Sequence, residues 1–102
     1  MSDVIPVIEV AGEVNASAEQ RLQEAYDAAT ANGARTVLLD FGPAEYINST
    51  GIALIVGLLA QARAGGVEVQ ATGLSDHYRE IFEITRLADF MTILPGGQSD
   101  GR

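Results

Sequence analysis

The stretch FGPAEYINSTGIALIVGLLA, residues 41–60, places three polar side chains directly before the most apolar segment of the chain. The segment from residue 49 to about 64 has the length of a helix, carries almost no charge and ends at two glycines. Such a helix is either largely buried or presents apolar surface to a partner. The polar residues at its start, Asn48, Ser49 and Thr50, are therefore candidates for a functional site.

Strand and helix patterns alternate on both sides of this stretch. The β-branched residues of Val4–Ala11 predict a strand, which Pro6 places at a sheet edge because proline cannot donate to the ladder. The nearly continuous apolar run Thr36–Phe41 predicts a central strand that is covered on both faces. Shorter signals predict the remaining elements: a turn at GEVNAS (12–17), a helix over Ser17–Ala31 with a capping box from Ser17 to Gln20, a loop over 42–48, a strand over Val67–Ala71, a helix capped by Ser75, and a short strand within Met91–Leu94.

This alternation predicts an α/β fold, with a mostly parallel four-stranded sheet flanked by three or more helices. We expect one domain over residues 1–95 and a flexible tail over 96–102. Ser49 is expected just beyond the carboxyl end of the central strand, in the first turn of the next helix. Ligands and partners of open α/β sheets usually meet them at this edge.

Charge and composition exclude several classes of function. The 102 residues include 14 acidic and 6 basic residues, all six of them arginine, for a net charge of -8. Such a chain lacks the cationic stripe that nucleic acids or anionic membrane surfaces require, whereas a basic patch on another protein is a suitable partner. The chain has no cysteine for a thiolate metal site, no signal-peptide pattern and no apolar run long enough to insert in a membrane, so we expect a cytoplasmic protein.

Ser49 has several possible roles. Asn48, Ser49 or Thr50 can each cap the helix, which is the plainest explanation of the triplet. A nucleophilic serine requires a base, but the lone histidine, His77, is expected on an exposed turn, and Ile47 replaces the first glycine of a G-x-S-x-G elbow. A phosphate-binding loop of the Walker type is disfavoured because the chain has no lysine. Asn48–Thr50 also fits the N-glycosylation pattern, which a cytoplasmic protein does not use.

Phosphorylation of Ser49 is the remaining possibility. A phosphate adds about -2 charges at a helix N-terminus, where free N–H groups and the helix dipole stabilise it by ~0.3–1 kcal/mol. The fold would therefore survive the modification. The same group at the centre of a contact face would weaken a partner's binding, which makes a switch.

Three segments of the sequence resemble STAS domains. GEVNAS resembles the G-E-L-D turn, TVLLDFGPAEYINSTGIALIV resembles the strand-loop-helix with the signature D-S-[ST]-G-[IL], and ARAGGVEVQATGLSDHYREIFEITRL resembles the strand-helix segment that follows. The similarity runs from about residue 8 to 94 and is most specific at NSTG. STAS domains include the anti-sigma factor antagonists and related domains of sulfate transporters.

The resemblance implies a non-enzymatic, partner-switching protein without a cofactor or metal of its own. It implies that the unphosphorylated chain sequesters an anti-sigma factor that is also a serine kinase. Phosphorylation at Ser49 breaks this complex, a serine phosphatase restores it, and ATP and Mg²⁺ belong to the kinase. The expected partner-binding residues surround the serine: Asn15, Glu45, Tyr46, Asn48, Ser49, Thr50 and Gly51.

Two positions depart from the family pattern, since Asn15 and Asn48 replace residues that are commonly aspartate. The loss of these acids lowers repulsion of a phosphate but removes groups that a kinase can read. An alternative within the same fold is an accessory subunit of an ABC-type lipid-transport ATPase, or a signalling scaffold, in which Ser49 and Thr50 are interface residues without phosphate turnover. A third hypothesis is a small enzyme that uses His77 and neighbouring carboxylates. The sequence does not indicate the oligomeric state.

Overall fold

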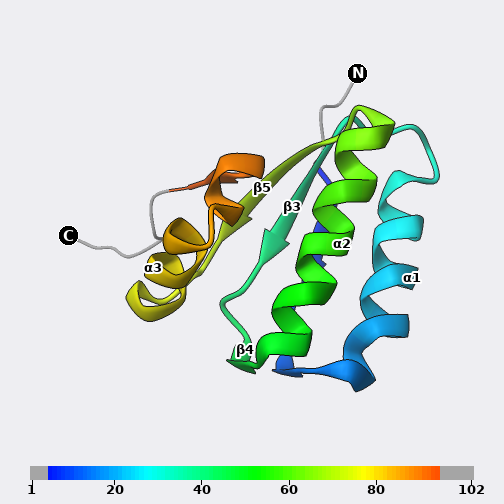
Figure 1. Cartoon of the computed structure of the whole chain (residues 1–102). Helices are drawn as coiled ribbons and strands as arrows, with labels where there is room; N and C mark the ends of the chain where they lie inside the picture. The colour runs from blue at the N-terminus through cyan, green and yellow to red at the C-terminus, as the bar shows by residue number, and fades with distance from the viewer. Residues whose placement is uncertain (1–4, 95–102) are drawn as a thin grey trace.

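The computed structural model describes residues 5–94 as two parallel sheets and three main helices (Figure 1). The expected tail, 96–102, lies outside the described residues. The elements follow one another in the order β1 (Val7–Glu9), β2 (Gly12–Val14), η1 (Ala16–Ala18), α1 (Glu19–Thr30), β3 (Thr36–Asp40), β4 (Ala44–Ile47), α2 (Ser49–Gly65), β5 (Glu68–Thr72), α3 (Asp76–Ile84), η2 (Leu87–Phe90) and β6 (Thr92–Ile93), where η denotes a 3-10 helix.

The larger sheet has the strand order β1-β3-β5-β6, and every neighbouring pair is parallel. This arrangement confirms the predicted α/β fold with β3 in the centre. It also confirms the edge position of the first strand, because β3 is the one neighbour of β1 among the described strands. The Pro6 carbonyl accepts a hydrogen bond from the Leu38 N–H at 2.9 Å, and Pro6 directly precedes Val7, the first residue of the strand, where a proline is tolerated.

Helices α1 and α2 lie side by side across one face of this sheet (Figure 1). Their side chains enclose an apolar core with the alternate strand residues Ile8, Val37, Leu39 and Val69, and no polar or charged residue among those described is buried. Leu38, on the opposite face of β3, is only half-buried. The expectation that this strand is covered on both faces was therefore wrong, because the two long helices pack on the same side.

The second sheet consists of β2 and β4 alone, and neither strand was predicted. The GEV of GEVNAS is a strand rather than a turn, and the expected loop over 42–48 contains the strand Ala44–Ile47. Each is too short to show a clear alternation of apolar residues, and each is stabilised by pairing with the other. Ser49 consequently follows the carboxyl end of β4 in the small sheet, not that of the central strand β3.

The start of the first helix also differs from the prediction. The Ser17 hydroxyl donates to Asn15 Oδ1 at 2.6 Å instead of capping the helix, and α1 begins at Glu19 with no side-chain cap. Asn15 takes the capping role one turn earlier, since its Oδ1 also accepts from the Ser17 N–H at 3.0 Å. The predicted capping box was therefore wrong, because a better acceptor precedes it. Ser75, in contrast, caps α3 as predicted, through Oγ and the Tyr78 N–H at 3.2 Å.

Candidate functional site

The small sheet brings the predicted site residues to one end of the molecule. Val14 of β2 pairs with Ile47 of β4, so Asn15 and Asn48 follow directly after two paired residues. A hydrogen bond of 3.2 Å from the Asn48 N–H to the Val14 carbonyl continues this pairing into the start of α2. Figure 1 shows β4 and the start of α2 together at this end.

Asn48 is the N-cap of α2. Its backbone is extended, and its Oδ1 accepts a hydrogen bond from the Gly51 N–H at 2.8 Å. Of the three residues that could have capped the helix, Asn48 therefore fills the role, and Ser49 and Thr50 are both exposed in the first turn. The Ser49 hydroxyl is not needed as a cap.

Gly51 is buried where α2 meets β2. A Cβ atom at this position would overlap the Val14 carbonyl oxygen and lie 2.8 Å from its carbonyl carbon. Backbone atoms cannot move aside as a flexible side chain can, so a side chain at residue 51 would push the helix away from the strand. Gly51 thus positions the Ser49 turn, and because it is buried it cannot be part of an exposed contact surface, whereas Ser49 and Thr50 are exposed.

Helix α3 contacts the end of β4, next to the site. The Tyr78 hydroxyl accepts a hydrogen bond of 2.9 Å from the Ile47 N–H, one residue before the Asn48 cap. Tyr78 is half-buried and packs against the core. Sequence reasoning missed this support because the spacing of Tyr78 in its helix says nothing about a strand that was not predicted.

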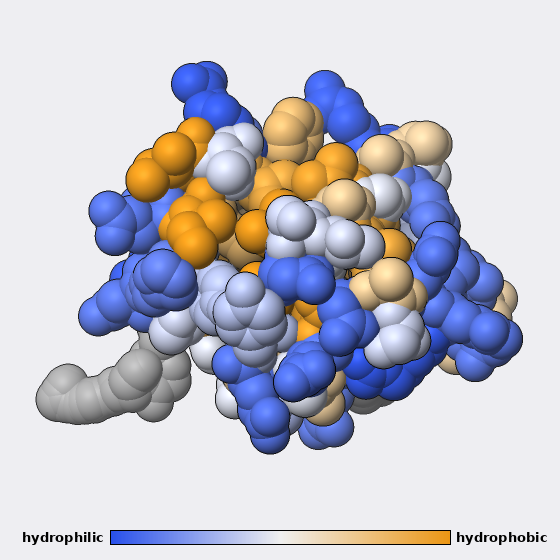
Figure 2. Space-filling view, turned by 60° about the horizontal axis from the view of Figure 1, so that its bottom comes forward, coloured by the Kyte–Doolittle hydropathy of each residue, from blue (hydrophilic) through white to orange (hydrophobic). Residues whose placement is uncertain are grey.

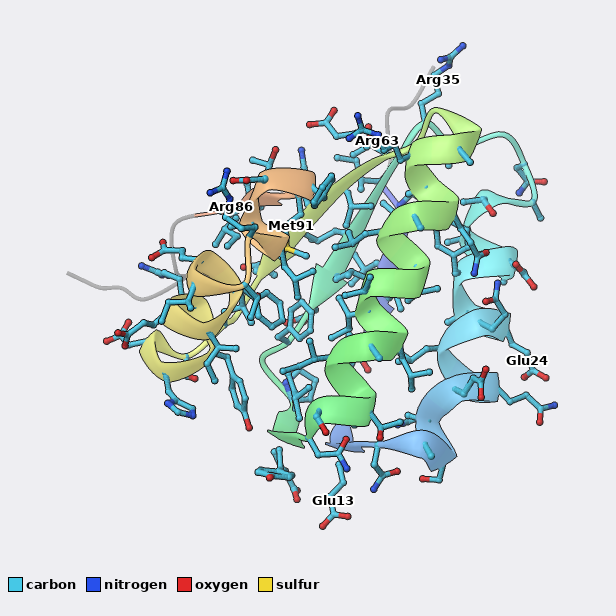
Figure 3. The ribbon with its side chains drawn as sticks, in the orientation of Figure 1. Glu13, Glu24, Arg35, Arg63, Arg86 and Met91 are labelled. Carbon is cyan, nitrogen blue, oxygen red and sulfur yellow. The ribbon has the colours of Figure 1, made fainter. Side chains whose placement is uncertain are left out.

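The exposed residues of the site are an aromatic ring, two acids and two hydroxyls. Tyr46 keeps 57% of its surface exposed, and Glu45 beside it is also exposed. Glu13 pairs with Tyr46 across the small sheet and projects outward beside the start of α2 (Figure 3). The surface around Ser49 and Thr50 is therefore acidic and half-apolar, a composition suited to a protein partner with basic groups.

Within the described residues, no hydrogen bond joins the Ser49 hydroxyl to a side chain that could act as a base. His77 is exposed on α3 and packs edge-to-face against the Tyr78 ring at 5.0 Å, and no described hydrogen bond joins it to Ser49. Asp40 Oδ1 accepts a hydrogen bond from the Gly42 N–H at 2.9 Å, so this carboxylate stabilises the turn after β3. Within residues 5–94, no group of three or more acidic or histidine side chains is placed to bind a metal ion, and no helix is long and apolar enough to cross a bilayer.

Comparison with known proteins identifies the family to which the chain belongs. Residues 1–95 match the family described as "Mlab, STAS domain". The chain belongs to the STAS domain family. A curated relative of this STAS domain, the anti-sigma-B factor antagonist of Staphylococcus aureus, is 30% identical over 89 residues, which cover 87% of this chain and 82% of the relative.

Solved structures share the fold of this STAS domain. The anti-sigma factor antagonist SpoIIAA in its unphosphorylated form aligns with a TM-score of 0.66 at 20% identity, over 87% of this chain and 77% of that one. The Bacillus cell fate determinant SpoIIAA in its phosphorylated form aligns with a TM-score of 0.65 at 22% identity, over 87% and 81%. At these identities the likeness concerns the fold alone.

Proposed function

We propose that this STAS domain is an anti-sigma factor antagonist that binds an anti-sigma factor through the end of the molecule around Ser49. In this proposal the anti-sigma factor is also a serine kinase, phosphorylation of Ser49 releases it, and a serine phosphatase restores the complex. The chain itself acts in the cytoplasm as a binding protein, not as an enzyme, and the kinase supplies ATP and Mg²⁺.

The observation that carries the proposal is the division of roles between Asn48 and Ser49. Asn48 caps the helix through Gly51, so the exposed Ser49 hydroxyl is available for modification without loss of the cap. The N–H groups of Ser49 and Thr50 lie in the first turn, where no intrahelical carbonyl reaches them. A phosphate at Ser49 would meet these donors and the positive end of the helix dipole.

The same phosphate would oppose binding by a partner. Ser49 is exposed in the first turn of α2, so a partner contact there removes its hydroxyl from water. A phosphate adds about -2 charges that must lose their hydration in such a contact, and Glu13 and Glu45 already make this end acidic. Folding tolerates the modification and the complex does not.

The relatives support the same function. The Staphylococcus aureus protein named an anti-sigma-B factor antagonist is similar over nearly the whole length of both chains. One of the solved structures with this fold is of a phosphorylated form. We infer by analogy that this chain takes part in a similar phosphorylation cycle, with Asn15 and Asn48 in the places that are commonly aspartate.

The test is site-specific phosphorylation. The purified chain is incubated with its cognate anti-sigma factor, ATP and Mg²⁺, and the segment 36–63 is fragmented by mass spectrometry. We expect one phosphate at Ser49 in the unmodified chain and in Thr50→Ala, and none in Ser49→Ala. We further expect Ser49→Asp to lose binding to the anti-sigma factor, whereas equal affinities of the Ser49→Asp and unmodified chains would contradict the proposal.

A different partner would favour the alternative function. If the chain from its native cells is unmodified under both growth and stress, and co-purifies with an ATPase subunit of a lipid transporter, the role of Ser49 and Thr50 is that of constitutive interface residues. The phosphorylation cycle would then be wrong for this chain, although the binding surface would be retained.

A further inference from the structure

The outward side of α2 carries an apolar stripe that starts at Ser49. Ser49, Val56 and Ala60 are spaced at i, i+7 and i+11, so they lie on one line along the helix. All three are exposed, and Val56 keeps 44% of its surface in contact with solvent. The first charged residue of α2 is Arg63, so the helix carries no charge from Ser49 through residue 62. The exposed side of α2 is thus unlike an ordinary solvated helix face.

The stripe leads into an apolar groove between α2 and η2. The groove has a volume of about 170 Å³, and α2 and η2 supply its lining: Val56, Leu59, Ala60, Arg63, Leu87 and Phe90. Phe90 forms one wall with 49% of its surface exposed, and the Arg63 guanidinium lies 5.5 Å from the centre of its ring. Pockets that bind free small molecules usually measure ~300–1,000 Å³, so this groove fits one side chain of a larger partner better.

Exposed hydrophobic side chains gather on one face of the molecule. Figure 2, which brings forward the end where α2 begins, shows them together in the upper half of the face, with hydrophilic residues around them. A contiguous exposed apolar area rimmed by polar residues is typical of a surface that binds another protein.

The charge along this surface changes sign. Glu13 and Glu45 lie at the Ser49 end, whereas Arg63 lies near the opposite end of α2 (Figure 3). Arg86, the other arginine near η2, is already paired with Asp89 at 2.9 Å. A matching partner segment therefore carries basic groups at one end, an apolar side chain in the middle and a carboxylate at the other end. A second copy of this chain fits less well, because each copy has a net charge of -8.

We propose that the protein that binds at Ser49 also docks in the α2–η2 groove, with an apolar side chain between Val56 and Phe90 and a carboxylate beside Arg63. This inference rests on the proposed function and extends its contact surface along the whole of α2. The groove is where the binding energy is concentrated, since a buried apolar anchor contributes more than exposed polar contacts at a rim. Ser49, at the other end of the stripe, provides the control by phosphate.

Site-directed photo-crosslinking in the native cells tests the extent of the surface. A photoreactive phenylalanine analogue replaces Tyr46 or Phe90, two aromatic residues that are about half exposed, and Glu24 on α1 provides the control position (Figure 3). We expect the same protein to be crosslinked at residues 46 and 90 but not at 24. If a protein is crosslinked at residue 46 but not at residue 90, the proposal that it docks in the groove is wrong, whereas the proposed function is unaffected.

Two other crosslinking results would also contradict the proposal. If residue 90 crosslinks to another copy of this chain, the groove is a self-association surface and the proposal is wrong. If residue 46 crosslinks to nothing, the proposed function fails, and the groove proposal fails with it.

Affinity measurements then test the chemistry of the groove. With the purified protein identified at residue 46, Val56→Ser and Arg63→Glu are each expected to weaken binding by about tenfold or more. Arg35→Glu, which makes the same charge change outside the groove, is expected to change affinity by less than about threefold at moderate salt. Val56 is exposed, so its variant should fold, which unchanged circular dichroism would verify. Unchanged affinity of Val56→Ser would overturn the apolar anchor.

Discussion

The two sheets of this STAS domain differ in how they are stabilised. The four-stranded sheet is covered by α1 and α2 and is held by a contiguous core of aliphatic side chains. The two-stranded sheet β2–β4 adds only Val14 and Ile47 to this core, and specific contacts also hold it in place: the Gly51–Val14 packing, the Asn48 cap and the hydrogen bond to Tyr78. The candidate site lies at the end of the two-stranded sheet, where β4 leads into α2. The buried contacts under the candidate site therefore affect stability, whereas its exposed side chains, such as Ser49, can be changed with little effect on the fold.

The largest effect should come from the core. Phe82 is completely buried and packs edge-to-face on Phe41 with ring centroids 5.7 Å apart. We expect Phe82→Ala to lower the free energy of unfolding by ~3–5 kcal/mol, because it removes apolar contacts and leaves a cavity. Urea unfolding measures this loss. A loss below about 1 kcal/mol would show that α3 is not part of the cooperative core.

Gly51→Ala should be the most damaging of the changes at the contact between α2 and the small sheet. The added methyl group overlaps the Val14 carbonyl, so we expect a loss of ~1–3 kcal/mol together with displacement of the Ser49 turn. Gly57→Ala in the same helix is the matched control, since nothing lies within 4 Å of a Cβ there. Alanine should stabilise that position by ~0.5–1 kcal/mol. Equal effects of the two variants in urea unfolding would refute the close packing of α2 on β2.

The Asn48 cap should contribute less. Asn48→Ala removes the acceptor of the Gly51 N–H, and we expect it to lower the free energy of unfolding by ~1 kcal/mol. Asn48→Asp retains the acceptor and adds favourable charge at the helix N-terminus, so it should keep at least the stability of the unmodified chain at neutral pH. If alanine were as stable as aspartate in thermal unfolding, Asn48 would not be the cap.

The sequence predicted the parts of the fold that have long periodic signals. Helix α2 begins at Ser49 and ends at a left-handed Gly66 as expected, and Ser75 caps α3, because these elements carry their start and stop signals within the chain. The strands β2 and β4 were missed because three or four residues show almost no alternation. Their stability comes from pairing with a distant segment, which no local pattern reveals.

The candidate site was predicted in outline but not in detail. The polar triplet before an apolar helix indicated a functional turn, yet three residues could equally have capped the helix. The structure assigns the cap to Asn48, because the extended backbone at that residue directs Oδ1 toward the Gly51 N–H. The groove beside Phe90 was not predictable, since it requires η2 to pack against α2, and 3-10 turns have weak sequence signals.

The smallest effect on stability should accompany the largest effect on regulation. Ser49→Ala removes an exposed hydroxyl that makes no described hydrogen bond, so its free energy of unfolding should lie within ~0.5 kcal/mol of the unmodified chain. Ser17→Ala is a suitable comparison, because it removes a hydroxyl that donates to Asn15 at 2.6 Å and should cost ~0.5–1.5 kcal/mol. Parallel urea unfolding of the two variants gives this contrast directly. A loss above about 1.5 kcal/mol for Ser49→Ala would mean that the hydroxyl supports the fold, and a serine that the fold requires could not be phosphorylated without structural damage.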